Sequence, residues 1–64
     1  MKPSIEMEFE FAYNCWKEKK EFDNETAKSL RECMDRTAGS EIDRVAEKYD
    51  VAFLKYIDER IAQV

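Results

Sequence analysis

Two sets of side chains in this chain have the types and spacing needed for chemistry. One is a run of carboxylates at alternate positions, Glu6, Glu8 and Glu10, and the other is a pair of cysteines, Cys15 and Cys33. Clustered carboxylates can bind calcium or act as a general acid and base. Near the positive end of a helix, however, acidic side chains are stabilised without any ligand, so we expect the three glutamates to form a solvated face.

The two cysteines do not make a metal site on their own. A structural zinc ion needs four Cys or His ligands, and the chain has two cysteines and no histidine. We expect Cys15 and Cys33 to be reduced and to pack in the core. A bridge between them is possible only if the first two helices face one another there, because the Cα atoms must approach within about 7 Å. The sequence also lacks a glycine-rich phosphate loop and a nucleophile elbow. It therefore predicts no enzymatic activity, no metal and no cofactor.

Composition and charge narrow the class further. The 64 residues include 11 basic and 15 acidic side chains, a formal net charge of −4, and 44% of them are hydrophobic. A chain of about 60 residues buries only about 60% of its unfolded surface, so we expect one domain, 1–64, whose core is dense or shared with a partner. No apolar run reaches the length of about 18 residues that spans a membrane, and the N-terminal glutamates do not fit a signal peptide. We therefore expect a cytoplasmic protein with no membrane contact.

The elements that would position these side chains are predicted to be helices. A single glycine and a single proline are too few for the turns of an all-β protein, which favours an all-α fold. Helix boundaries are expected at the cap candidates Asp23 and Asn24 and at Gly39, and Ser40 and Asp43 have the spacing of a capping box. The sequence predicts a small three-helix bundle with helices over about 4–22, 24–38 and 41–63.

The third predicted helix contains a phase break. Val51 and Leu54 fall on its polar side when 41–63 is read as one helix. A break at Asp50, which can adopt turn geometry and cap a following helix, would bring the last residues back into phase and bury Val51 in the turn. The stripe would then consist of Leu54, Ile57, Ile61 and Val64. A four-helix bundle is therefore the alternative to the three-helix bundle.

The first segment has two interpretations. Residues 5–11 alternate between apolar and acidic, the pattern of a half-buried strand, but the alternation stops there and no second strand follows to pair with it. A helix accounts for more of the segment, and the strand is kept as the minority alternative. At about 100° per residue, the helix carries two apolar rows. The first row consists of Ile5, Phe9, Ala12, Tyr13 and Trp16, and the second row consists of Met7, Phe11, Cys15 and Phe22.

Two apolar rows on one helix need two covering surfaces. One row can face the intramolecular core, and the other is then left for a second molecule. A central helix of a small bundle can also bury both rows internally, and periodicity does not separate these two arrangements.

The segment around the phase break resembles a helix-turn-helix unit. That family has a small residue, a tight-turn residue four positions later and then a buried residue. In the segment that starts at Val45, these positions are held by Ala46, Asp50 and Val51. The resemblance covers about twenty residues and implies a DNA-binding transcriptional regulator. Asp50 stands where the family prefers glycine, and Glu59 stands where it places a buried aliphatic side chain.

The charges argue against a DNA reader. The segment from Gly39 onward carries four basic and six acidic residues, whereas binding to phosphates needs a basic patch. The positions expected to face the DNA groove hold no Arg, Lys, Asn or Gln to read base edges. These positions are Ala52, Phe53, Leu54, Ile57, Asp58 and Ile61. The strand alternative resembles the ribbon-helix-helix family, but it would turn Glu6, Glu8 and Glu10 towards the phosphates.

We therefore expect a small acidic helical module that binds another protein as an inhibitor, an adaptor or a regulatory subunit. A helix-turn-helix DNA-binding regulator is the alternative, although nucleic acid is disfavoured as a partner. The expected partner-binding side chains are Met7, Phe11 and Phe22 of the second row, with Phe53 and Leu54 as a second patch. Self-association into a homodimer is an alternative use of the same surface.

Overall fold

The computed structural model describes residues 4–64 and contains four helices and no strand in this range. The helices are α1 (Ile5–Lys19), α2 (Asn24–Asp35), α3 (Gly39–Ala46) and α4 (Val51–Ile61). The all-α prediction is confirmed, and the four-helix alternative describes the bundle correctly. The strand alternative for the first segment is wrong, because α1 covers all of residues 5–11.

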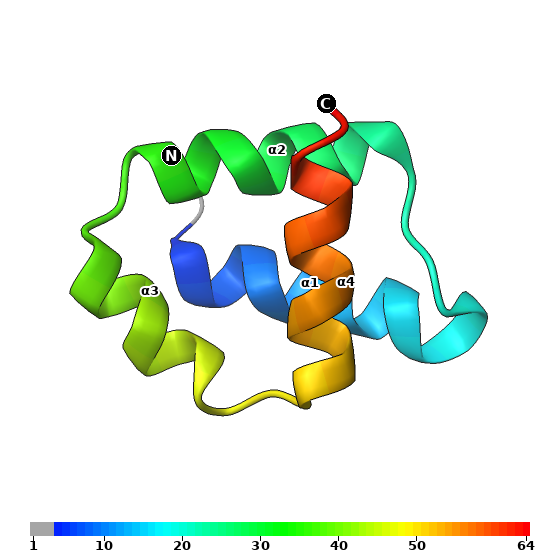
Figure 1. The fold of residues 1–64 in the computed structure, drawn as a ribbon, viewed down its shortest axis with the longest axis horizontal. Coiled ribbons are helices and arrows are strands. Elements are labelled where there is room, and N and C mark those ends of the chain that lie inside the picture. Colours follow the sequence, from blue (N-terminus) through cyan, green and yellow to red (C-terminus); the bar gives the residue numbers. More distant parts are fainter. Residues whose placement is uncertain (1–3) are drawn as a thin grey trace.

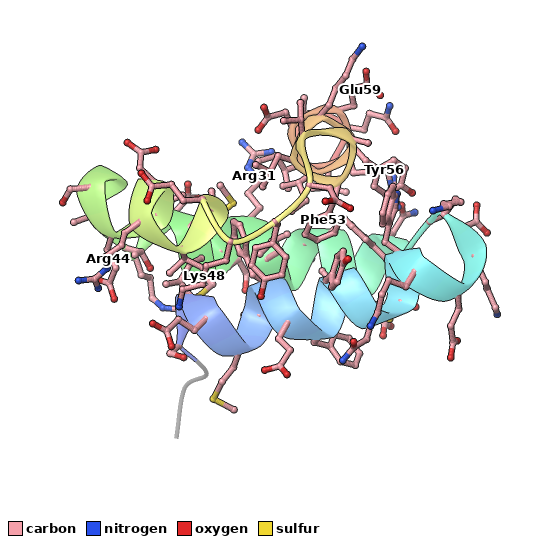
Figure 2. All side chains as sticks on the ribbon, turned by 90° about the horizontal axis from the view of Figure 1, so that it is seen from below. Arg31, Arg44, Lys48, Phe53, Tyr56 and Glu59 are labelled. Atoms are coloured by element: carbon pink, nitrogen blue, oxygen red, sulfur yellow. The ribbon has the colours of Figure 1, made fainter. Side chains whose placement is uncertain are left out.

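The helices form two layers. Figure 1 shows α1 and α2 side by side and antiparallel, with α4 crossing both of them and α3 at the end of the pair where α1 begins. Figure 2, turned by 90°, shows α4 nearly end-on above the α1–α2 pair. The side of the α1–α2 pair that faces α4 is therefore the covered side.

Helix α1 ends earlier than predicted. Its start is the predicted one, because the Ser4 hydroxyl caps it by accepting a hydrogen bond from the Met7 N–H at 3.3 Å. At its other end Lys20 adopts a left-handed conformation (φ 59°), and its N–H donates to the Trp16 carbonyl at 2.7 Å. The sequence gives no glycine signal for this stop. The early end leaves Phe22 outside the helix.

Helix α2 starts at the predicted cap but also ends early. The Asp23 carboxylate accepts a hydrogen bond from the Thr26 N–H at 2.8 Å, and this bond lowers the pKa of Asp23 below its ordinary value. At the C-terminal end the Thr37 hydroxyl donates to the Cys33 carbonyl at 2.7 Å, and Ala38 is extended. The helix therefore ends at Asp35 rather than near residue 38.

The predicted capping box at Ser40 and Asp43 is wrong. Ala38 holds the N-cap position of α3 with no side-chain bond, and α3 begins at Gly39, so that Ser40 is already inside the helix. The backbone carbonyl of Ala38 accepts from the N–H groups of Glu41 and Ile42 at 3.0 and 3.1 Å. Gly39 has a negative φ and does not end α2 in a left-handed conformation.

The last predicted helix does break at Asp50. This residue holds the N-cap position of α4 in an extended conformation, without a side-chain capping bond. Val51, expected to be buried in the turn, is 81% exposed, whereas Val45 of α3 and Phe53 of α4 are buried. The predicted α4 stripe is correct at Ile57, which is buried, whereas Leu54, Ile61 and Val64 are half-buried.

One hydrophobic core joins all four helices. Its centre is a group of aromatic rings in which Phe53 of α4 lies 5.1 to 5.5 Å, centroid to centroid, from the rings of Tyr13, Trp16 and Tyr49. Figure 2 shows Phe53 pointing from α4 towards the α1–α2 pair. Burial raises the pKa of the Tyr49 hydroxyl, and the nearby negative charges of Glu10 and Glu6 raise it further. The buried side chains are Ile5, Phe9, Ala12, Phe22, Ala27, Leu30, Cys33, Val45, Phe53 and Ile57.

The cysteines take different places in this core. Cys33 is buried on α2, as predicted, and Cys15 is half-buried on α1; both are thiols.

Within residues 4–64, no helix has both the length and the apolar character needed to cross a membrane.

Candidate protein-binding surface

The two rows of α1 have different surroundings. In the first row Ile5, Phe9 and Ala12 are buried in the core. In the second row Met7 is 61% exposed and Phe11 is 57% exposed. Since these two residues are four positions apart, their side chains lie one turn apart on the same face of α1. Large apolar side chains exposed next to one another mark a candidate contact surface.

The rest of the second row is progressively covered. Cys15 is half-buried, and Phe22 is only 5% exposed. The Phe22 ring meets the ring of Tyr56 edge-on at 5.0 Å, and the Arg60 guanidinium lies 5.9 Å from its centroid. Phe22 is therefore packed in the core of this structure rather than exposed like Met7 and Phe11.

Side chains of α4 hold Phe22 in this position. The Phe22 N–H donates to the Tyr56 hydroxyl oxygen at 3.3 Å, and Figure 2 shows Tyr56 pointing from α4 towards the C-terminal end of α1. Arg60 donates from Nη2 to the Phe22 carbonyl at 3.1 Å and to the Asn24 side-chain oxygen at 2.8 Å. When 41–63 is read as one helix, Arg60 is a cation inside the apolar stripe, and its hydrogen bond to the Phe22 carbonyl accounts for this placement.

An open groove runs beside Met7 and Phe11. It consists of two adjoining depressions of about 430 and 550 Å³ that share Phe11, Asp23 and Thr26 as lining residues. We call it the α1–α2 groove, because its walls come from α1, from the start of α2 and from the connection between them. Its other lining residues are Met7, Glu8, Cys15, Glu18, Lys19, Glu21, Phe22, Asn24, Glu25, Ser29 and Arg60.

A buried carboxylate lies at one end of this groove. The Glu8 residue is 8% exposed, and its Oε1 accepts a hydrogen bond from the Ser29 hydroxyl at 3.0 Å. The predicted solvated face is thus correct for Glu6 and Glu10, which are exposed, and wrong for Glu8. Glu8 lies between the two apolar rows, so the packing of α2 against α1 covers it and Ser29 provides the donor that a buried acceptor needs.

The α1–α2 groove is acidic. Five carboxylates line it against two cationic groups, a formal local excess of three negative charges. One of the two cations, Arg60, is already engaged with the Phe22 carbonyl and the Asn24 side chain. The surface around the exposed Phe11 therefore favours a positively charged ligand.

The second predicted patch does not form. Phe53 is fully buried at 0% exposure, and Leu54 is half-buried against the core. Phe53 therefore lies in the core rather than on an exposed patch, because its ring fills the centre of the aromatic group. The large hydrophobic residue that α4 does expose is Val51, the first residue of the helix.

The solvent face of α4 carries more negative than positive charge, which opposes contact with the phosphates of DNA. The exposed residues of this helix are Val51, Ala52, Lys55, Asp58 and Glu59, with one cation against two carboxylates. Figure 2 shows Glu59 projecting away from the rest of the molecule on this face. Phe53 and Ile57, which the helix-turn-helix resemblance placed towards the groove of DNA, are buried instead.

Residues 4–64 contain no group of three or more His, Cys, Asp or Glu side chains positioned to hold a metal ion. In comparisons with known proteins, the chain matches no family model, no curated protein and no solved structure.

Proposed function

We propose that this protein is a small helical module that binds another protein through the α1–α2 groove. The observation that carries the proposal is the exposed pair Met7 and Phe11, which continues the apolar surface of α1 beyond the core. Burying one such side chain is worth about 1.5 to 3 kcal/mol, so the pair supplies two anchors for a contact. The module acts by contact, as an inhibitor, an adaptor or a regulatory subunit, and not as an enzyme.

The partner is a different protein rather than a second copy of this chain. A twofold contact centred on Phe11 would place the acidic rim of one copy, which includes Glu18, Glu21 and Glu25, against the same rim of the other. Like charges at close range oppose such a dimer. A cytoplasmic place of action fits the two cysteines, which are thiols.

A second candidate function rests on the break between α3 and α4. Two helices joined through the short segment 47–50 have the element order of a helix-turn-helix unit, which is the basis for a DNA-binding regulator. The excess of carboxylates on the exposed face of α4 opposes this function. Sequence-dependent duplex binding that persists at about 0.15 M salt would replace the protein-binding proposal with this one.

The test of the protein-binding proposal compares two exposed apolar residues. Phe11→Glu and Val51→Glu introduce the same charge at positions that are 57% and 81% exposed. We expect both variants to melt close to the wild type, because surface substitutions usually change stability by about 0.5 kcal/mol or less. We expect the tagged wild type and Val51→Glu to retain the same protein from extracts of the host cell, and Phe11→Glu to lose it.

Light scattering and thermal unfolding complete this test. The wild type should have the mass of a monomer at micromolar concentration. If it forms a dimer that Phe11→Glu dissociates, the groove binds a second copy and the heterologous partner must be abandoned. If Phe11→Glu unfolds a monomeric protein, Phe11 belongs to the core and the proposed surface does not exist.

A further inference from the structure

We infer that the α1–α2 groove receives a cationic amphipathic segment of its partner, with apolar side chains on Met7 and Phe11 and Lys or Arg side chains on the acidic rim. This inference rests on the proposed function and specifies the chemistry of the partner.

The apolar centre suits a helical ligand. Met7 and Phe11 present two side chains one helical turn apart beside an open groove. An amphipathic helix offers its own apolar residues at the same repeat of three or four positions. Methionine is unbranched, so the exposed Met7 side chain can adapt its shape to different side chains of a ligand.

Within the described residues 4–64, the rim carboxylates Glu18, Glu21 and Glu25 have no ion partner. Among residues 4–64, the side-chain ion pair within 4.0 Å joins Arg44 to Glu41 on α3, away from the groove. Glu18, Glu21 and Glu25 line the groove and are exposed. Their charges are therefore open to Lys or Arg side chains of a ligand.

Two of the three lysines near the end of α1 are directed to aromatic rings, whereas the third, Lys19, lines the α1–α2 groove. The Lys20 ammonium lies 4.1 Å from the centroid of the Trp16 ring, and the Lys17 ammonium lies 5.1 Å from that of Tyr13. Both rings belong to the first row, which faces the core. These cation–π contacts hold two positive charges at the rings of the first row.

The probes are three synthetic peptides of about 18 residues, about 27 Å long as helices, which matches the 28 Å longest extent of the protein. All three carry Leu at the repeat of an amphipathic helix. Their polar faces carry Lys in the first peptide, Gln in the second and Glu in the third. We expect the Lys peptide to bind at least about tenfold more tightly than the Gln peptide, and the Glu peptide to bind more weakly still.

Two triple variants distinguish the effect of the charges in the groove from the effect of the total charge of the protein. Glu18→Gln, Glu21→Gln and Glu25→Gln together remove three charges from the groove. Glu32→Gln, Glu47→Gln and Glu59→Gln together remove three charges from exposed positions outside it. Asp23 is left unchanged because its carboxylate caps α2. We expect the groove variant to lose about tenfold in affinity for the Lys peptide and the outer variant to lose less than about threefold.

Salt and Phe11 provide the remaining readouts. Raising the salt from about 0.05 to about 0.5 M should weaken the Lys peptide on the wild type and have less effect on the groove variant. Phe11→Glu removes an apolar contact but adds a carboxylate that attracts Lys. We therefore expect this variant to lose less affinity for the Lys peptide than for the Gln peptide. Phe11→Ser, which adds no charge, should weaken both peptides.

Each other outcome overturns a defined statement. If the Lys and Gln peptides bind equally well and Phe11→Ser abolishes the binding of both, the cationic ligand is rejected and the proposed protein-binding function stands. Equal losses in the two triple variants would assign the attraction to total charge and reject the groove as its source. If no peptide binds while a host protein still depends on Phe11, only the cationic inference fails. If neither peptides nor host proteins depend on Phe11, both the inference and the proposed function fail.

Discussion

Phe9 and Phe11 belong to the same helix, have the same side chain and lie two residues apart, yet one is 1% exposed and the other is 57% exposed. Phe9 lies on the face of α1 that the other helices cover, and its ring meets that of Tyr49 at 5.8 Å. Phe11 lies on the face beside the start of α2, where an open groove remains. The hydrophobicity of a residue therefore does not decide its burial here, and the positions of the other helices do.

Phe22 is a third phenylalanine whose spacing groups it with Phe11 but which is buried like Phe9. By spacing it belongs to the second row with Phe11, but the early end of α1 at Lys19 releases it to fold against α4. Tyr56 and Arg60 then bind its backbone and cover its ring. The second row is thus divided into an exposed part, Met7 and Phe11, and a buried part, Phe22, which packs in the core.

The largest expected effect is a loss of stability when the buried Phe9 is replaced. Phe9→Ala should cost about 3 to 5 kcal/mol, because it removes a fully packed ring and leaves a cavity. A domain of this size has about 3 to 5 kcal/mol of total stability, so this variant should be largely unfolded. Phe11→Ala should change stability by about 0.5 kcal/mol or less. Urea titration followed by circular dichroism measures both; equal losses would show that Phe11 is packed as tightly as Phe9.

A smaller loss of stability is expected when the hydrogen bond between Tyr56 and Phe22 is removed. Tyr56→Phe keeps the ring against Phe22 but removes the oxygen that accepts the Phe22 N–H. We expect a loss of about 0.5 to 1.5 kcal/mol, the usual net contribution of one hydrogen bond. Denaturant unfolding followed by Trp16 fluorescence measures it. An unchanged midpoint would mean that water replaces the hydroxyl and that ring packing alone holds Phe22.

The smallest effect concerns the cap at the edge of the α1–α2 groove. The hydrogen bond from the Thr26 N–H lowers the pKa of Asp23 below 3.8 in the folded protein. A lowered carboxyl pKa contributes stability above the unfolded pKa, and this contribution is lost as the pH falls through the folded pKa. Asp23→Asn keeps a capping oxygen but not the charge, so the wild type should melt slightly higher than this variant at about pH 6 and equally at about pH 2.

A difference between the wild type and Asp23→Asn that stays constant from about pH 6 to pH 2 would contradict the assignment of this charge to the cap. Asp23→Ala, which lacks a capping oxygen, should melt lower than both at about pH 6.

The fold could be predicted from the sequence to the level of helices and their faces. The start of α2 at its Asp23 cap, the first row of α1 and the break at Asp50 all follow from local periodicity and cap residues, which do not depend on where the other helices lie. The end of α1 at Lys20 was missed because a lysine, not a glycine, adopts the left-handed conformation there. The capping box at Ser40 was missed because α3 begins one residue before it without any side-chain cap.

The candidate surface could be predicted only in part. Met7 and Phe11 were found because spacing separates the two rows of α1, whereas Phe53 was placed on the surface although it fills the centre of the core. Its burial depends on three rings from distant segments, Tyr13, Trp16 and Tyr49, and no local pattern indicates such contacts.

The sequence by itself determined that this protein is helical and acidic and that α1 has more apolar surface than one small core face requires, because these properties depend on residue types and spacing along the chain. Only the tertiary structure decided which apolar row is covered, that Glu8 is buried against Ser29, and that carboxylates gather around Phe11. These features depend on where α2 and α4 lie against α1, and such long-range packing brings together residues that no sequence interval relates.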